Sequence, residues 1–190
     1  CRLPFIIGFM SPPEESWATG THVILMGVCG AGKTAVGKAL AKRVGRLFLD
    51  ADDFHPECNV NKMNRGEPLT DEDRASWLQK IAAELERHQK YSTYVVLACS
   101  ALKQKYRTQL AQRSDISWVH LKGSPELISQ RLRDRAGHFM NPDLLDSQFH
   151  TLEEPVDALA CDISDSVEHV VETIYRFFAR EQYTGATRQD

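Results

Sequence analysis

The chain has 190 residues, of which 42% are hydrophobic and 26% are charged, and its formal net charge at pH 7 is -3. These values fit one soluble domain with a sizeable core, and no apolar run is long enough to span a bilayer, so we expect no membrane partner. The slightly acidic balance argues against a non-specific grip on nucleic acid and leaves a small molecule as the expected partner.

The chain starts at Cys1 with a short apolar stretch that is broken by proline and followed by SPPEES. We predict a flexible leader at residues 1–19, a single domain at residues 20–180 and a flexible tail at residues 181–190. A secretory signal is the alternative for the leader, but the stretch lacks a small-residue cleavage site. The five cysteines form no Cys-x-x-Cys pair and are odd in number, which favours a reducing compartment, so we expect a cytoplasmic protein.

The first predicted elements are a strand at residues 23–26 and a helix at residues 34–44, joined by the sequence GVCGAGKT. This loop matches GxxxxGK[ST], in which glycines let successive N–H groups converge on phosphate oxygens and the next helix adds its positive end. Lys33 would reach the β- and γ-phosphates, and Thr34 would hold Mg²⁺. We therefore predict that a nucleoside triphosphate is bound by Gly27, Val28, Cys29, Gly30, Ala31, Gly32, Lys33 and Thr34.

Further strand-like runs at residues 46–49, 94–98, 118–121 and 158–163 alternate with helix-like segments. Several are continuous apolar runs, which are typical of strands that are buried on both faces. The alternation predicts an α/β fold, a three-layer sandwich with a central parallel sheet of about five strands and helices on both faces.

Side chains that cap helices mark several of the predicted helix starts. Thr70 with Asp73 three residues later resembles a capping box, and Ser124 and Asn141 each precede a proline at the first helical position. The last predicted helix, from residue 167, carries one apolar stripe at helical spacing, which indicates packing against the core.

Acidic residues follow the second predicted strand, where ligands of open parallel sheets bind. In the sequence DADDFH, alternation along an extended segment would point Asp50 and Asp52 the same way, towards the phosphates. One carboxylate could support Mg²⁺ through its water shell and the other could accept a proton from an attacking hydroxyl. The alternative is a solvated acidic turn.

The third strand leads into ACSALKQKYR, in which we expect Ser100 to cap a helix. Lys103, Tyr106 and Arg107 would then share one helix face, because they stand at positions i, i+3 and i+4. That face offers charge and hydrogen-bond donors to a carboxylate with several hydroxyls, and an ordinary basic surface helix remains the alternative.

The segment QRLRDRAGHFM places Arg131 and Arg135 four residues apart and is followed by a glycine and His138. This pattern predicts a lid whose arginines neutralise charge on the transferring phosphoryl group while the closed segment excludes water. An exposed basic helix end is the alternative.

Taken together, GVCGAGKT, LDADDFHP, NKMNRGEPLTDEDRASWL, ACSALKQKYR, GHFM and LLDSQFHTLEEP resemble the gluconokinase family over roughly residues 21 to 175. The resemblance implies a shikimate-kinase-like P-loop fold with a lid. It also implies transfer of the γ-phosphoryl group of ATP to the 6-hydroxyl of D-gluconate, which forms 6-phospho-D-gluconate for the pentose phosphate pathway. A homodimer is a further expectation from the family.

The resemblance also implies roles for individual residues. Asp52 would be the base or orienting carboxylate at the hydroxyl, with Asp50 nearer to Mg²⁺, and Lys33, Arg131 and Arg135 would act on the phosphates. The implied contacts of the sugar acid are Asp52, Lys62, Arg74, Lys103, Arg107, His138 and Gln148, supported by His55, Ser100 and Tyr106.

Two other functions compete with this one, a shikimate or nucleotide kinase on the same scaffold and a non-catalytic nucleotide-sensing switch. The stretch at residues 61–64 lacks the aspartate of a guanine-binding NKxD box, which argues against a GTPase switch. The third strand ends in Cys99 and Ser100 rather than in the carboxylate of a Walker B site, which disfavours an ATPase motor. A shikimate kinase would carry a glycine run where this chain has CSALK. These differences favour a sugar acid as the acceptor.

Overall fold

The structure is a computed structural model that describes residues 20–134 and 142–185. In this part of the chain a single sheet is formed by β1 (His22–Met26), β2 (Leu47–Asp50), β3 (Val95–Ala98), β4 (Ile116–Lys122) and β5 (Leu159–Asp162). All neighbouring strands pair in parallel, in the order β2-β3-β1-β4-β5. The helices are α1 (Lys33–Val44), η1 (Ala51–Phe54), α2 (Glu57–Asn64), α3 (Asp71–Lys90), α4 (Gln104–Ala111), α5 (Pro125–Asp134), α6 (Pro142–Thr151) and α7 (Val167–Gly185).

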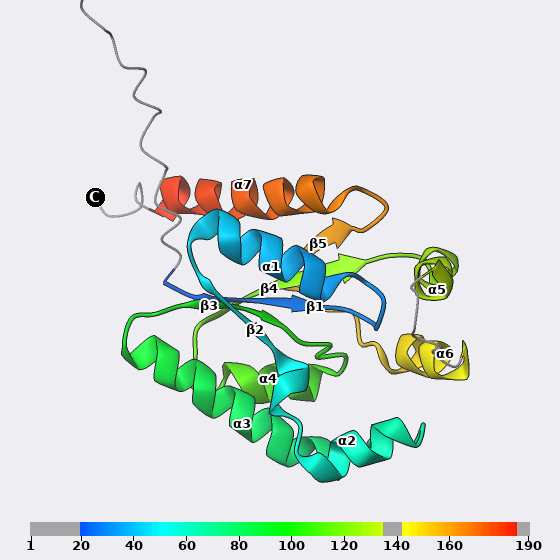
Figure 1. Cartoon of the computed structure of the whole chain (residues 1–190). Coiled ribbons are helices and arrows are strands. Elements are labelled where there is room, and N and C mark those ends of the chain that lie inside the picture. The colour runs from blue at the N-terminus through cyan, green and yellow to red at the C-terminus, as the bar shows by residue number, and fades with distance from the viewer. Residues whose placement is uncertain (1–19, 135–141, 186–190) are drawn as a thin grey trace, which may run out of the picture.

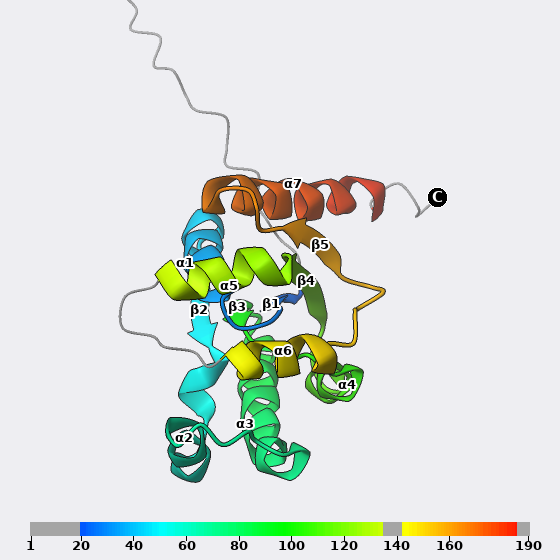
Figure 2. The same ribbon diagram turned by 90° about the vertical axis from the view of Figure 1, so that its right-hand side faces the viewer.

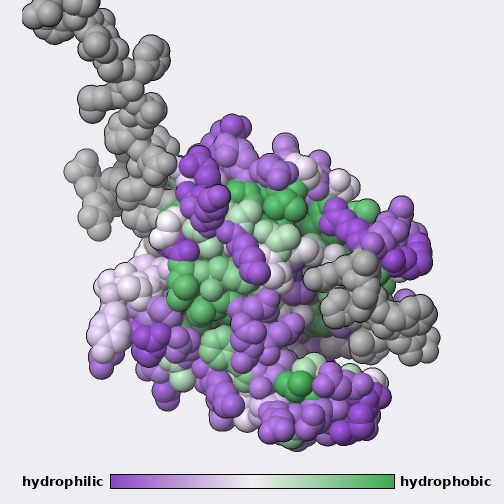
Figure 3. All heavy atoms as spheres, in the orientation of Figure 1, coloured by the Kyte–Doolittle hydropathy of each residue, from purple (hydrophilic) through white to green (hydrophobic). Residues whose placement is uncertain are grey.

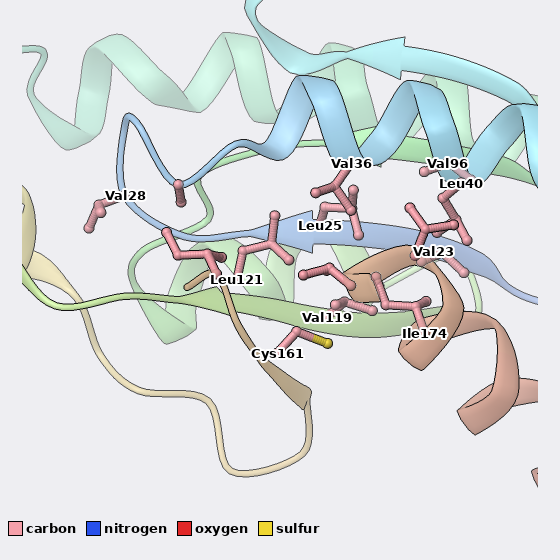
Figure 4. Close-up of a cluster of buried hydrophobic side chains, with 14 of the residues drawn as sticks. Val23, Leu25, Val28, Val36, Leu40, Val96, Val119, Leu121, Cys161 and Ile174 are labelled. Carbon is pink, nitrogen blue, oxygen red and sulfur yellow. The ribbon is translucent and has the colours of Figure 1, made fainter. Parts of the chain in front are cut away.

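Helices cover both faces of the sheet, with α1 and α7 on one face and α3 and α4 on the other (Figure 1). Side chains alternate along β1, so Val23 and Leu25 join the core cluster beneath α1 and α7, whereas Ile24 and Met26 join the cluster on the α3 side. Figure 4 shows the first of these clusters, in which Val36 and Leu40 of α1 lie close to β1. The predicted three-layer α/β sandwich is confirmed.

The strands begin and end within about two residues of the predicted limits, which is the usual uncertainty of such boundaries. The capping box at the start of α3 is also confirmed, because Thr70 Oγ1 accepts from the N–H of Asp73 and the Asp73 carboxylate accepts from the N–H of Thr70. Ser124 Oγ accepts from the N–H of Leu127 at 3.2 Å at the start of α5. Asn141 lies outside the described residues.

One predicted cap is wrong. The helix after β3 does not begin at Ser100, because α4 begins at Gln104 with Lys103 as its N-terminal flanking residue. Ala101 has a φ of 42°, so the chain turns sharply after the strand before it can enter the helix. Ser100 consequently contributes to the loop at the carboxyl end of β3.

The surface seen in Figure 3 is largely hydrophilic over α2 and α3, whereas hydrophobic residues gather nearer to the sheet and to α7. In the described part of the chain no helix is both long enough and apolar enough to cross a bilayer. Among the large apolar side chains of that part, Leu47 at the start of the edge strand β2 is 52% exposed.

A buried histidine begins the central strand β1 and leads to a prediction about pH. The His22 imidazole donates from Nε2 to the carbonyl of Leu85 at 3.0 Å and accepts at Nδ1 from the N–H of Val95 at 3.2 Å. Burial lowers the pKa of His22 from 6.5 to about 4. Between these values the unfolded chain binds more protons, so the free energy of unfolding should fall as the pH is lowered from 6.5 towards 4.

Urea denaturation at several pH values measures this dependence. A His22→Gln variant keeps an amide donor but does not titrate, so its free energy of unfolding should fall less steeply over the same interval. Equal slopes for the variant and the parent would show that His22 does not contribute to the pH dependence.

Candidate active site

The sheet order places β1 between β3 and β4, so the loop after β1 opens at the point where the strand order reverses. Ligands of open parallel sheets bind at this point, beyond the carboxyl ends of the strands. The structure has a cavity of about 750 Å³ there. Its walls include Cys29, Gly30, Ala31, Gly32, Lys33, Thr34, Asp50, Asp52, Cys99, Ser100, Arg131, Leu132, Ile163, Asp165, Ser166, Val167 and Val170.

Two glycines shape the loop between β1 and α1. Gly27 has a φ of 139°, and a Cβ atom there would lie 2.7 Å from the carbonyl oxygen of Leu121. Gly30 has a φ of 82°, and a Cβ atom there would lie 2.9 Å from Leu132 of α5. A side chain at either position would meet both backbone strain and a clash, so the loop keeps its shape only with glycine.

Lys33 begins α1 and turns back over the loop. Its Nζ donates to the carbonyls of Gly27 and Val28 at 3.0 and 2.9 Å. Burial lowers the pKa of Lys33, while the nearby acids, including Asp52 and Asp50, oppose this shift. The ammonium group therefore lies against the loop, where phosphate oxygens are expected.

The aspartates after β2 both line the cavity, as predicted, but the reason given for their common direction is wrong. The segment from Ala51 to Phe54 is the 3-10 helix η1 rather than an extended strand. Asp50 caps this helix, since its Oδ1 accepts from the N–H of Asp52 at 3.2 Å while its Oδ2 accepts from Thr34 Oγ1 at 2.9 Å. A tight turn thus brings the two carboxylates to the same wall.

Asp52 has the electrostatic surroundings of a proton acceptor. The residue is solvent-exposed within the cavity, yet partial desolvation and then the negative charge of Asp50 raise the pKa of its carboxyl group, while Lys33 opposes the rise. A raised pKa makes a carboxylate a better base at neutral pH. The geometry and the charges thus both suit Asp52 to receive a proton near the phosphates.

Trp77 supports this turn, and the sequence analysis did not identify it as functional. Its Nε1 donates to the carbonyl of Ala51 at 2.6 Å, directly before Asp52, and its indole stacks on the His55 ring with centroids 4.4 Å apart. The buried indole of α3 therefore fixes η1. The apolar periodicity of α3 identifies Trp77 as a core residue, but nothing in the sequence shows which carbonyl its N–H reaches.

The lid prediction falls mostly outside the described residues. Arg131 of α5 lines the cavity and donates from Nη2 to the carbonyl of Ile163. Arg135 and His138 lie in the segment that the structure does not describe. Of the predicted phosphate-binding arginines, Arg131 is therefore the one that can be placed, among the residues that line the cavity.

Acidic residues in the first turn of α3 pair with two of the predicted cations, Lys62 and Lys103. The Asp71 carboxylate accepts from Lys103 Nζ at 3.0 Å and also from Lys105 and the Tyr106 hydroxyl. These three donors hold the pKa of Asp71 well below its usual range. Lys62 of α2 pairs in the same way with Asp73 at 2.8 Å.

His55, which follows η1, and Arg74, in the first turns of α3, are two further predicted contacts of the sugar acid. Burial, followed by the positive charge of Arg74, lowers the pKa of His55 to about 4, so its ring is neutral near pH 7. Arg74 Nη1 donates to the carbonyls of Leu69 and Thr70. Lys62, Arg74, Lys103 and Tyr106 thus surround the start of α3, next to the turn that carries Asp52.

Arg107 differs from its predicted neighbours Lys103 and Tyr106. It is 2% exposed, and its Nη1 donates to the carbonyls of Ala101 and Leu102 while its Nη2 donates to that of Glu153. The guanidinium group thus faces backbone carbonyls rather than the Asp71 carboxylate. The spacing of these residues along the helix does not show that the Arg107 side chain is buried while that of Lys103 is not.

The predicted metal ligands fit a magnesium ion. The hydroxyl of Thr34 and the carboxylate of Asp50 lie together on the cavity wall, and both are the hard oxygen donors that Mg²⁺ prefers. In residues 20–134 and 142–185 no group of three or more His, Cys, Asp or Glu side chains could hold a metal by itself. The donor set therefore suits an ion that is shared with phosphate oxygens and water.

Comparison with known proteins places this geometry in a family context. The family model for shikimate kinase matches residues 29–179. A probable gluconokinase of Xenopus tropicalis is 43% identical over 171 residues, covering 80% of this chain and 90% of the relative. The thermoresistant gluconokinase of Escherichia coli (strain K12) is 41% identical over 153 residues, covering 78% of this chain and 87% of the relative.

Among solved structures, the crystal structure of a gluconokinase from Sinorhizobium meliloti 1021 superposes with a TM-score of 0.81 at 35% identity. The superposition covers 90% of this chain and 98% of that chain. The likeness therefore extends over most of the chain.

Proposed function

The chain belongs to the gluconokinase family of shikimate-kinase-like P-loop kinases, and we propose that it phosphorylates D-gluconate at the 6-hydroxyl with ATP as donor. Membership of this family makes it an ATP-dependent phosphotransferase. The observation that carries the proposal is the placement of Asp52 in the same cavity as Lys33 and the phosphate-binding loop.

In the proposed reaction the 6-hydroxyl oxygen attacks the γ-phosphorus while the bond to the bridging oxygen of ADP breaks. Asp52 accepts the hydroxyl proton, because its raised pKa favours proton uptake and its carboxylate faces the cavity. Lys33 and Arg131 stabilise the negative charge on the phosphoryl oxygens. The products are 6-phospho-D-gluconate and ADP.

Thr34 and Asp50 are the proposed holders of Mg²⁺, directly or through water, and the ion would supply charge neutralisation at the phosphates. The proposed adenine side of the cavity is lined by four residues that follow β5, Ile163, Asp165, Ser166 and Val167. We assign this segment to the nucleotide because it lines the same cavity as the phosphate-binding loop.

The proposed acceptor site is the region around the start of α3. Lys62, Lys103 and Arg74 supply positive charge for the carboxylate of gluconate, and Tyr106 and the neutral His55 supply hydrogen bonds to hydroxyls. Asp71 and Asp73 hold the lysines in place, so binding of the sugar acid would exchange one carboxylate partner for another. The roles of Ser100, His138 and Gln148 at this site stay predictions, as does the role of Arg135 at the phosphates.

A panel of acceptors tests this function. With Mg-ATP and a coupled assay for ADP, D-gluconate should be turned over at least about 10²-fold faster than shikimate or a nucleoside monophosphate, because a site built for one set of polar groups rejects analogues that leave them unpaired. Equal turnover across the panel would contradict the proposal. Tight ATP binding without any acceptor-dependent ADP would instead indicate a nucleotide-sensing switch.

Two further expectations accompany the proposal. The free thiols of Cys29, Cys58, Cys99 and Cys161 suit a reducing compartment such as the cytoplasm. A homodimer is proposed from the family alone, and size-exclusion chromatography with light scattering would measure it.

A further inference from the structure

A long-range hydrogen bond ties helix α6 to the phosphate-binding loop. Gln148 Oε1 accepts from the backbone N–H of Cys29 at 2.7 Å, although the two residues are 119 positions apart. Both residues are half-buried. Figure 2 shows α6 in front of the carboxyl end of the sheet, level with the space between the loop after β1 and the helices α3 and α4.

The C-terminal end of α6 has contacts of its own, besides that of Gln148. Just beyond Leu152, which follows the helix, Glu153 donates its N–H to the carbonyl of Leu102 at 2.9 Å, and its own carbonyl accepts from Arg107 Nη2 at 2.9 Å. Its carboxylate accepts from the N–H of Gln104 at 2.5 Å. Because Arg107 is almost fully buried, this anchor holds the end of α6 firmly against the loop before α4.

The bond to Cys29 suits a loop that must receive an anion. A glycine-rich loop has many accessible backbone conformations, and ordering it when the nucleotide arrives would cost binding free energy. An acceptor on a rigid helix reduces this cost by holding the loop in shape beforehand. The acceptor here is a neutral amide oxygen, which fixes the N–H without placing a negative charge beside the phosphates.

We propose that Gln148 is a positioning residue that preorganises the phosphate-binding loop through its hydrogen bond to Cys29. The contacts between Arg107 and Glu153 hold α6 in place. The inference rests on the proposed function for the identity of the nucleotide. It assigns Gln148 to the donor side of the reaction, which differs from its predicted contact with the sugar acid.

Amide hydrogen exchange tests the structural half of this inference without any acceptor. Selective ¹⁵N labelling of cysteine restricts the spectrum to the five cysteines of the chain, and loss of one peak in Cys29→Ser assigns the Cys29 amide. In Gln148→Met, which keeps the side-chain length but replaces the amide oxygen by a thioether, a much weaker acceptor, this amide should exchange about twofold to tenfold faster. The Cys99 amide, which donates to the carbonyl of Leu25, is an internal reference that should not change.

Ser147→Ala is the matched control, because Ser147 is the exposed neighbour of Gln148 on the same helix. An unchanged exchange rate for Cys29 in Gln148→Met would overturn the inference. If Gln148→Met does not fold, Gln148→Glu replaces it, since a carboxylate still accepts from Cys29 and should keep the amide protected while its charge weakens ATP binding.

Kinetics test the functional half. Gln148→Met should raise the KM for ATP about twofold to tenfold and leave kcat and the KM for gluconate unchanged. A rise confined to the KM for gluconate would return Gln148 to the acceptor site and overturn the inference, as would tighter binding of ATP. If the parent protein turns over no acceptor, the proposed function fails, but exchange at Cys29 and binding of a fluorescent ATP analogue still decide the role of Gln148.

Discussion

Asp52→Asn is expected to lower kcat by at least about 10²-fold, because the amide can no longer accept the hydroxyl proton. ATP binding should be largely kept, since the loop amides and Lys33 that would hold the nucleotide are untouched. Steady-state kinetics with gluconate, together with binding of a fluorescent ATP analogue, measure the two effects separately. A kcat equal to that of the parent would remove Asp52 from the mechanism.

Asp52→Asn should lower kcat without lowering the thermal stability of the protein. The folded-state pKa of Asp52 is raised, so between its unfolded and folded pKa values the folded chain binds more protons, and ionisation of Asp52 opposes folding as the pH rises. Asp52→Asn should therefore unfold at the same temperature as the parent or higher at pH 7. Asp53→Asn is the matched control, because Asp53 is the exposed neighbour and does not line the cavity.

Lys33→Met is expected to lower kcat/KM by about 10²- to 10³-fold or more, because removal of one preorganised donor at a developing charge has an effect of this order. Nζ of Lys33 already lies within hydrogen-bond distance of two loop carbonyls, so little reorganisation is needed when phosphate replaces them. Lys33→Arg should not restore full activity, since a planar guanidinium does not fit the space of a compact ammonium group.

The control for this variant is Lys42→Met, which removes a cation of the same helix that is exposed and does not line the cavity. Its kinetics should match those of the parent, and thermal unfolding should show that both lysine variants are folded. Retention of more than about a tenth of the parental kcat/KM by Lys33→Met would show that the loop amides act without this lysine.

The sequence was sufficient to predict the elements of the fold and the phosphate-binding loop, because both depend on local patterns. Apolar runs and capping residues such as Thr70 set strands and helices within a few residues, and the spacing of Gly27, Gly32 and Lys33 is itself the loop motif. Asp50 and Asp52 were also found, although the structure corrects the reason from strand alternation to a 3-10 turn.

The partners of the long side chains could not be predicted in this way. The sequence predicts one shared helix face for Lys103, Tyr106 and Arg107. In the structure the first two donate to the Asp71 carboxylate, whereas Arg107 donates to three backbone carbonyls. A helical repeat specifies direction around an axis, but it carries no information about which neighbouring element supplies an acceptor at that direction.

What the sequence by itself determined is therefore the scaffold, the phosphate-binding loop and the two aspartates, since each depends on residues that are close together along the chain. What only the tertiary structure decided is the set of contacts between distant segments: the Trp77 indole on the turn of Asp52, the cations on the first turn of α3, and Gln148 on the loop. These contacts depend on how the helices pack on the sheet, and packing brings together residues whose separation in sequence carries no local signal.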